Sequence, residues 1–106
     1  MKRRLRFTQQ ARRDFAAILD WYTENMGART ANKVGATITK RLRALGAGRV
    51  RGTEASTRQE TRYLRAVARQ HAIIFLPKDD ELQITRIVHV AQDIEAILAK
   101  LGDDAR

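Results

Sequence analysis

The chain has 106 residues, no cysteine and a formal net charge of +9 at pH 7. This length corresponds to one domain with a modest core. The lack of cysteine excludes a disulfide framework and a thiolate metal site. No apolar run approaches the roughly 18 residues of a transmembrane helix, and the basic start MKRRLRFT lacks the apolar segment of a signal peptide. We therefore expect one cytoplasmic domain over residues 1–106, with residues 102–106 as a tail.

The positive charge is concentrated in the first two thirds of the chain. Residues 1–69 carry 17 Lys or Arg against 5 Asp or Glu, whereas residues 70–106 carry 4 against 7. Such an excess predicts a polyanionic partner, which can be a nucleic acid, an acidic protein segment or a nucleoprotein assembly. A basic surface kept only for solubility is the less favoured interpretation, because the charge is not interspersed.

The N-terminal half predicts a strand followed by two helices. Residues 2–7 alternate between basic and apolar side chains, as a half-buried strand does. The hydroxyl of Thr8 can cap the first helix, and Gly27 stands where that helix ends. Apolar side chains at steps of three and four mark one stripe on each helix: Ala11, Phe15, Ile18, Leu19, Tyr22 and Met26, then Ala31, Val34, Ile38, Leu42 and Leu45. Two helices with almost no connection form an antiparallel hairpin.

The C-terminal half predicts three short strands and a closing helix, after an irregular loop over residues 46–61. Residues 63–68 and 82–90 alternate, and residues 72–76 form a continuous apolar run. Strict alternation places two sets on opposite faces of the last strand: Leu82, Ile84, Arg86, Val88 and Val90, against Gln83, Thr85, Ile87 and His89. The closing helix is marked by Val90, Ile94, Ile97, Leu98 and Leu101, and Gly102 is expected to end it.

The element order is therefore β-αα-βββ-α, which is an α+β fold. Sequential strands joined by tight turns form an antiparallel meander, and the helical stripes need a sheet to pack on. We expect a small, mostly antiparallel sheet packed by a helical hairpin and a C-terminal helix. The residues expected in its core are Phe15, Ile38, Ile73, Phe75, Ile84, Val88 and Ile97.

Three segments carry a resemblance to a known family. FTQQARRDFAAILDWYTENMG contains the pair Asp14–Phe15 and an aromatic at Tyr22, YLRAVARQHAIIF reads as two paired strands, and ITRIVHVAQDIEAIL as a last strand that runs into a helix. In this order they resemble the ParE/RelE superfamily of toxins from bacterial type II toxin–antitoxin systems, the ParE branch most closely. The resemblance implies a RelE/ParE-like fold and a plasmid-stabilising, growth-arresting toxin. It also implies a hetero-oligomeric complex with a cognate ParD-like antitoxin.

The two branches imply different activities. A ParE-like toxin binds DNA gyrase, where its target is known, whereas a RelE-like toxin cleaves mRNA on the ribosome. A metal-independent ribonuclease needs a base, an acid and cations that hold the phosphate. The side chains able to supply them are Glu60, Arg62, Arg65, His71, Arg86 and His89.

The sequence favours inhibitory binding over catalysis. Arg86 and His89 are three residues apart, so they lie on opposite faces of a regular strand. The closing helix also lacks the aromatic or basic group that RelE-like nucleases usually carry at the C-terminal end. The alternative is an endoribonuclease that uses Arg62, Arg65 and His89, and a third possibility is a degenerate member that only forms a complex. We expect no cofactor and no metal, because two histidines without the HExxH spacing do not predict a zinc site.

Two interaction surfaces are predicted. The antitoxin is expected on a groove beside the helical hairpin, since seven basic residues and no acid lie between Ala28 and Gly52. The residues assigned to it are Trp21, Arg29, Lys33, Lys40, Arg41 and Arg43. The resemblance implies that the closing segment acts on the target, and the residues assigned there are Arg62, Arg65, Arg86, His89, Gln92 and Asp93. For Arg65 and Arg86 the alternative is an internal ion pair with Glu60 or Asp93.

Overall fold

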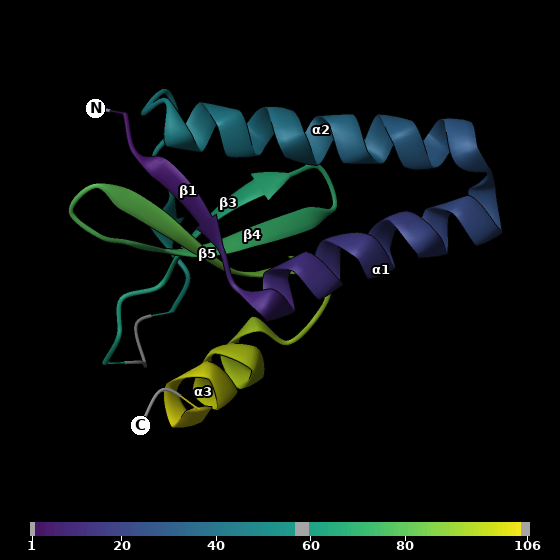
Figure 1. The fold of residues 1–106 in the computed structure, drawn as a ribbon. Coiled ribbons are helices and arrows are strands. Elements are labelled where there is room, and N and C mark those ends of the chain that lie inside the picture. Colours follow the sequence, from purple (N-terminus) through teal and green to yellow (C-terminus); the bar gives the residue numbers. More distant parts are fainter. Residues whose placement is uncertain (1, 57–59, 105–106) are drawn as a thin grey trace.

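The computed structural model describes residues 2–56 and 60–104, with side chains to residue 101, as helices packed on a five-stranded sheet (Figure 1). The elements in chain order are β1 (Arg4–Phe7), α1 (Gln9–Met26), α2 (Ala28–Gly46), β2 (Thr53–Glu54), β3 (Leu64–Ala68), β4 (His71–Pro77), β5 (Glu81–His89) and α3 (Ile94–Asp104). The predicted α+β fold is confirmed, and the element order agrees with the prediction except for the additional short strand β2. The described helices include none that is long and apolar enough to cross a membrane.

The sheet has the strand order β1-β5-β4-β3-β2. Strands β3, β4 and β5 form the predicted antiparallel meander, whereas β1 pairs in parallel with β5. Strand β2 was not predicted, because its two residues are too few to show a period. It lies inside the loop expected to be irregular and pairs with the start of β3. The result is a mostly antiparallel sheet with both edge strands short.

The helical hairpin forms as predicted. The Thr8 hydroxyl accepts a hydrogen bond from the N–H of Ala11 at 3.1 Å and so caps α1. Gly27 ends α1 and starts α2, with φ 90°. A side chain at that φ is strained, so glycine lets the chain reverse without a linker. Figure 1 shows α1 and α2 side by side and extending together past the sheet.

The sheet is covered on both faces. The hairpin packs on one face over a cluster that includes Ile38, Ile73 and Ile84, each with no exposed surface. On the other face α3 contributes Leu98 to a smaller cluster with Tyr63, Ala72, Ile74 and Val88. Figure 1 accordingly shows α3 on the side of the sheet away from α2. Of the seven residues expected in the core, five are buried, and Phe15 and Ile97 are only partly buried.

A bulge in β5 overturns the predicted alternation. Ile74 pairs with Arg86 whereas Phe75 pairs with Ile84, so Thr85 is an extra residue in β5. Ile87 consequently faces the hairpin together with Ile84, and Val88 faces α3. The hydroxyl of Thr85 donates to the carbonyl of Ile74 at 3.0 Å, which satisfies the polar group that the bulge buries.

The C-terminal prediction also needs correction. Val90 is not part of the closing helix and is 42% exposed, while α3 begins only at Ile94. The helix runs through Gly102 to Asp104, although Gly102 was expected to end it and to begin a tail. A glycine inside a helix costs about 1 kcal/mol relative to alanine, so it lowers the preference for a helix without forbidding one.

Candidate functional site

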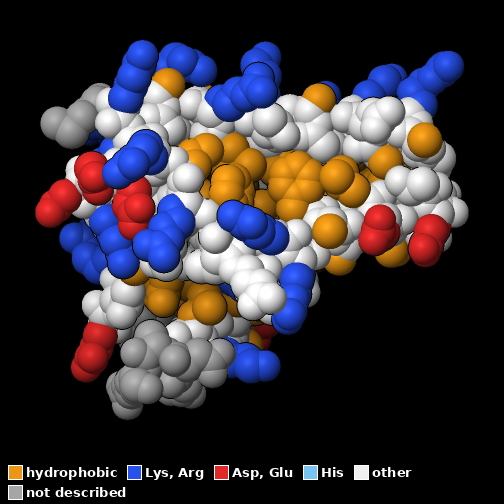
Figure 2. Space-filling model, in the orientation of Figure 1, with side chains coloured by type: hydrophobic (Ala, Val, Ile, Leu, Met, Phe, Trp, Pro, Cys, Tyr) orange, Lys and Arg blue, Asp and Glu red, His pale blue; other side chains and the backbone are white. Residues whose placement is uncertain are grey.

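A large groove lies between the helical hairpin and the ends of β3, β4 and β5. Its volume is about 1480 Å³. Helix α1 contributes Trp21, Tyr22 and Met26, of which Trp21 is 54% and Met26 57% exposed. Figure 2 shows hydrophobic side chains gathered between α1 and α2, with Lys and Arg side chains along the outer side of α2. Exposed apolar side chains of this size in one concave surface indicate a binding site for a protein partner.

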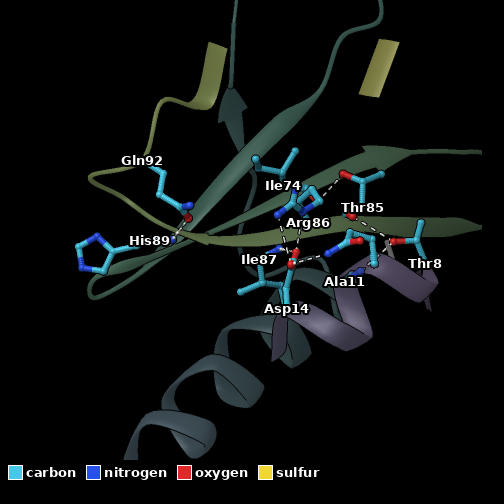
Figure 3. Close-up of polar contacts among 10 residues, drawn as sticks. Thr8, Ala11, Asp14, Ile74, Thr85, Arg86, Ile87, His89 and Gln92 are labelled. Atoms are coloured by element: carbon cyan, nitrogen blue, oxygen red, sulfur yellow. Dashed lines mark hydrogen bonds and ion pairs between the residues drawn. The ribbon is translucent and has the colours of Figure 1, made fainter. Parts of the chain in front are cut away.

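An ion pair between α1 and β5 stands at the wall of this groove. The Nε of Arg86 donates to Oδ2 of Asp14 at 2.7 Å, and a second guanidinium nitrogen donates to Oδ1 at 3.2 Å (Figure 3). The N–H of Ile87 also donates to Oδ2 at 2.9 Å, and Gln10 donates to Oδ1 at 3.0 Å. Arg86 therefore forms an internal ion pair, as the alternative interpretation expected, but its partner is Asp14 and neither Glu60 nor Asp93.

Asp14 lies beside the part of the β5 edge that β1 does not cover. Strand β1 pairs with β5 only as far as Ile84, which leaves the rest of that edge open. Helix α1 continues the pairing with side chains, because the Thr8 hydroxyl donates to the carbonyl of Thr85 at 3.0 Å and Asp14 accepts from Ile87 (Figure 3). The carboxylate was detectable in sequence as an acid between the apolar positions Ala11 and Phe15.

Four rings lie in succession at the sheet end of the groove. The ring centroids of Trp21 and Tyr22 are 5.1 Å apart, those of Tyr22 and His71 5.9 Å, and those of His71 and His89 5.7 Å, all edge to face. His71 and His89 are direct partners across β4 and β5. Burial, followed by the charge of His89, lowers the pKa of His71 below its ordinary 6.5. His71 is therefore a neutral ring at neutral pH.

His89 organises the turn that follows β5. Its Nδ1 accepts a hydrogen bond from the N–H of Ala91 at 3.0 Å, and its own N–H donates to Oε1 of Gln92 at 3.0 Å (Figure 3). This is the hydrogen-bonding role expected of a histidine at a strand–helix junction. Because Nδ1 accepts, the neutral ring carries its proton on Nε2.

The residues assigned to the target fall into separate places. Arg86, His89 and Gln92 line the groove. Arg62 is exposed and forms an ion pair with Glu54 at 3.2 Å, and Asp93 accepts from the N–H of Ala96 in the first turn of α3. Arg65 is exposed on β3, and among the described residues no ion pair or side-chain hydrogen bond involves it.

The alternative catalytic set is not brought together. Leu64, Ala66 and Ala68 of β3 face the hairpin, so Arg65 points to the opposite face of the sheet. His89 faces the groove under the hairpin. Among the residues that the structure describes, no three His, Asp or Glu side chains are grouped to hold a metal ion.

The residues assigned to the antitoxin are also divided. Trp21 and Lys33 line the groove, whereas Lys40 and Arg41 line a smaller hollow beside β3. Arg29 and Arg43 are exposed outside both. Met26 lies at the surface, although its place on the apolar stripe of α1 predicted burial. Sequence analysis also missed Arg69, which lies in the turn between β3 and β4 and lines both hollows.

Comparison with known proteins identifies relatives of the chain. The family model described as ParE toxin of type II toxin-antitoxin system, parDE, matches residues 5–94. A chain of the chromosomal ParDE system from P. aeruginosa is similar in structure, with a TM-score of 0.67, 27% identity and coverage of 83% of this chain and 96% of that one. No curated protein matches the chain.

Two further structures share the fold. They are a YoeB dimer and a YoeB–YefM complex, both from Staphylococcus aureus, with TM-scores of 0.55 and 0.53. Each is 16% identical and covers 84% of this chain and 98% of its own. At this identity the likeness concerns the fold alone.

Proposed function

Because the chain belongs to the ParE toxin family of type II toxin–antitoxin systems, we propose that it arrests growth by binding and inhibiting DNA gyrase in the cytoplasm. A cognate ParD-like antitoxin neutralises it by binding the groove between the hairpin and the sheet. The observation that carries the antitoxin part is the groove itself, with its exposed Trp21 and Met26.

The occupant that fits this groove is an amphipathic segment with acidic residues at its edge. The floor is apolar and accepts a hydrophobic helix face. Lys33 and Arg69 stand in the lining as free cations, because no ion pair between described residues involves either of them. Arg86 is already neutralised by Asp14. Acidic residues at the edge of the bound segment can therefore pair with Lys33 of the hairpin and with Arg69 of the β3–β4 turn.

Inhibitory binding is supported over catalysis by the separation of the candidate groups. An endoribonuclease needs its base and its phosphate-holding cations around one scissile bond. Arg65 and His89 lie on opposite faces of the sheet, and Arg62 pairs with Glu54. A rigid arginine on a sheet face can instead anchor a protein target, and Arg65 is the side chain best placed for this.

Expression of the chain in cells that carry a reporter plasmid tests the proposed target. Plasmid supercoiling and incorporation of a labelled amino acid are followed together after induction. We expect supercoiling to fall first, with protein synthesis intact at that time. Purified chain is then added to gyrase and relaxed plasmid, where it should block supercoiling, and the antitoxin should restore it. Early loss of translation with cleaved mRNA and normal supercoiling would make the toxin a RelE-like ribonuclease and sink the gyrase proposal.

A further inference from the structure

A second hollow lies outside the groove, between the C-terminal half of α2 and the edge of β3. Its volume is about 340 Å³. Three of its lining residues are cations, namely Lys40, Arg41 and Arg69. Thr37 also lines it, with its hydroxyl donating to the carbonyl of Lys33 at 2.9 Å. Among the residues that the structure describes, no acidic side chain lines it. Cations gathered without an acid repel one another, so this arrangement is stabilised by an anion from outside.

The cations of this hollow have no internal partners. The ion pairs between described residues involve neither Lys40, Arg41 nor Arg69. The Nε of Arg41 is buried and has no hydrogen-bond partner among the described residues. The Nε of Arg3 is likewise buried without a partner among the described residues, so the Nε of Arg41 supports a bound group only together with the cations around it.

Arg69 is held in an unfavourable backbone conformation. It is the first residue of the two-residue turn between β3 and β4, and its φ is 56°. Turns of this kind favour Gly or Asn at a positive φ, because other side chains are strained there. An arginine at this place adds charge to the hollow at the expense of local stability, which is typical of a residue kept for binding.

We infer that this hollow binds a phosphate group of a nucleic-acid backbone. Arginine and lysine recognise phosphate through charge-assisted hydrogen bonds. An acidic protein segment is the weaker fit. The apolar side chains among the described lining residues are Ala44, Val67 and Ala68, which are too small and too few to hold an apolar anchor of a protein partner.

Further basic side chains lie near the hollow along α2. Helix α2 carries five basic and no acidic residues, and Arg43 lies exposed one turn beyond Lys40. Lys and Arg side chains stand along the outer side of α2 (Figure 2). A backbone that places one phosphate in the hollow can therefore lay the next along the helix. This inference goes beyond the proposed gyrase target and does not depend on it, because it concerns binding by the purified chain alone.

The test measures binding of a fluorescent duplex of about 20 base pairs to the purified chain over a range of salt concentrations. The test variants are Lys40→Gln and Arg69→Gly, singly and together. The matched control is Arg12→Gln with Arg13→Gln, which removes two exposed charges from α1. We expect the double test variant to bind about tenfold more weakly at about 0.1 M salt and the steepness of its salt dependence to fall by about 1, as for one lost phosphate contact, while the affinity of the control changes less than about twofold.

Two further measurements separate a phosphate site from a structural role. Arg69→Gly should keep or raise the melting temperature because glycine relieves the positive φ, yet should still bind the duplex more weakly. Inorganic phosphate should shift the amide NMR signals of Thr37 and Arg69 in the parent chain but not in Lys40→Gln. Equal losses in test and control variants, absence of duplex binding, or tighter binding of an acidic peptide of equal charge would each overturn the inference.

Discussion

Asp14 binds Arg86 across 72 residues of chain, and the same carboxylate oxygen that accepts from Arg86 Nε at 2.7 Å also accepts the N–H of Ile87. The pair is largely enclosed, with 9% of the Asp14 side chain and 21% of the Arg86 side chain exposed. Asp14 therefore joins α1 to β5 where β1 no longer covers the strand.

The two halves of this pair should differ in their effect on stability. Asp14→Ala leaves a guanidinium and a backbone N–H without partners, so we expect a loss of about 3 kcal/mol. Arg86→Ala leaves Asp14 with the N–H of Ile87 and the amide of Gln10, and we expect about 1–2 kcal/mol. Urea unfolding of both variants checks this order. A larger loss for Arg86→Ala would mean that the guanidinium, not the carboxylate, holds β5.

Arg65→Ala tests the proposed target surface. Arg65 is exposed and unpaired among the described residues, so we expect a melting temperature within experimental error of the parent's. Antitoxin binding should also persist, because Arg65 lies outside the groove. Growth arrest should be lost. Lys78→Ala, an exposed cation in the β4–β5 turn, is the matched control. A folded Arg65→Ala chain that still arrests growth would move the toxic surface elsewhere.

Gly52 lies against the ring of Phe75. A Cβ on Gly52 would come within 2.5 Å of Phe75 Cζ and 2.9 Å of the carbonyl oxygen of Arg65. Phe75 is 2% exposed and the carbonyl belongs to β3, so neither can move freely. We expect Gly52→Ala to cost about 1–3 kcal/mol by overpacking and Phe75→Ala to cost about 3–5 kcal/mol. In the double variant the two losses should be less than additive, because the smaller side chain makes room. Full additivity in thermal or urea unfolding would show that the two positions do not touch.

The lowered pKa of His71 predicts a loss of stability in acid. Below about pH 6.5 the unfolded chain takes up a proton on this ring, whereas the folded chain does so only at lower pH. The stability that the neutral His71 ring contributes is therefore fully present above about pH 6.5 and is lost as the pH falls toward the pKa of His71 in the folded chain. Urea unfolding between about pH 7.5 and about pH 5.5 measures it. The free energy of unfolding should change less with pH over this range in His71→Gln. An unchanged pH dependence would show that other groups cause it.

The groove predicts how the antitoxin binds. Trp21→Ala removes the largest exposed apolar side chain of the lining, and we expect a loss of about 2 kcal/mol, or roughly thirtyfold in Kd. Val90→Ala, which trims an exposed apolar residue outside the lining, should leave the affinity unchanged. Affinity should also fall as salt rises, because an acidic flank is screened. Binding that does not depend on salt would contradict an acidic flank on the antitoxin. A Trp21→Ala chain with unchanged affinity would contradict the groove as the binding site.

The order of elements could be predicted from sequence because each long element has a clear period. The stripes of α1 and α2 and the apolar run of β4 define their structure without tertiary help. The bulge at Thr85 was not predicted. The polar–apolar alternation of β5 breaks at Arg86 and Ile87, but the residue that bulges is held by hydrogen bonds of Thr85 with Ile74 and Thr8. The parallel pairing of β1 with β5 depends on which edge strand of the meander is free to accept it. Local sequence patterns do not indicate which edge that is.

The kinds of residue in the site could be predicted from sequence, but not which of them the fold brings together. The apolar hairpin with basic residues indicated an interaction surface, and Trp21 and Lys33 do line the groove. Asp14 was noticed only as part of a resemblance, because a single acid on an apolar stripe does not reveal its partner 72 residues later. Arg69 had no signal in sequence, since its positive φ is a property of the turn that it occupies.

The pairing of the first strand with the last has a consequence for synthesis. Arg4–Phe7 leave the ribosome long before their partners Glu81–Ile84 are made. Such distant pairing forms late, because closing a long loop costs entropy before contacts compensate for it. Strand β5 also supplies Arg86, Ile87 and His89 to the groove. A translation product that stops before β5 therefore has neither the complete five-stranded sheet nor the groove, and both form only after β5 has been made.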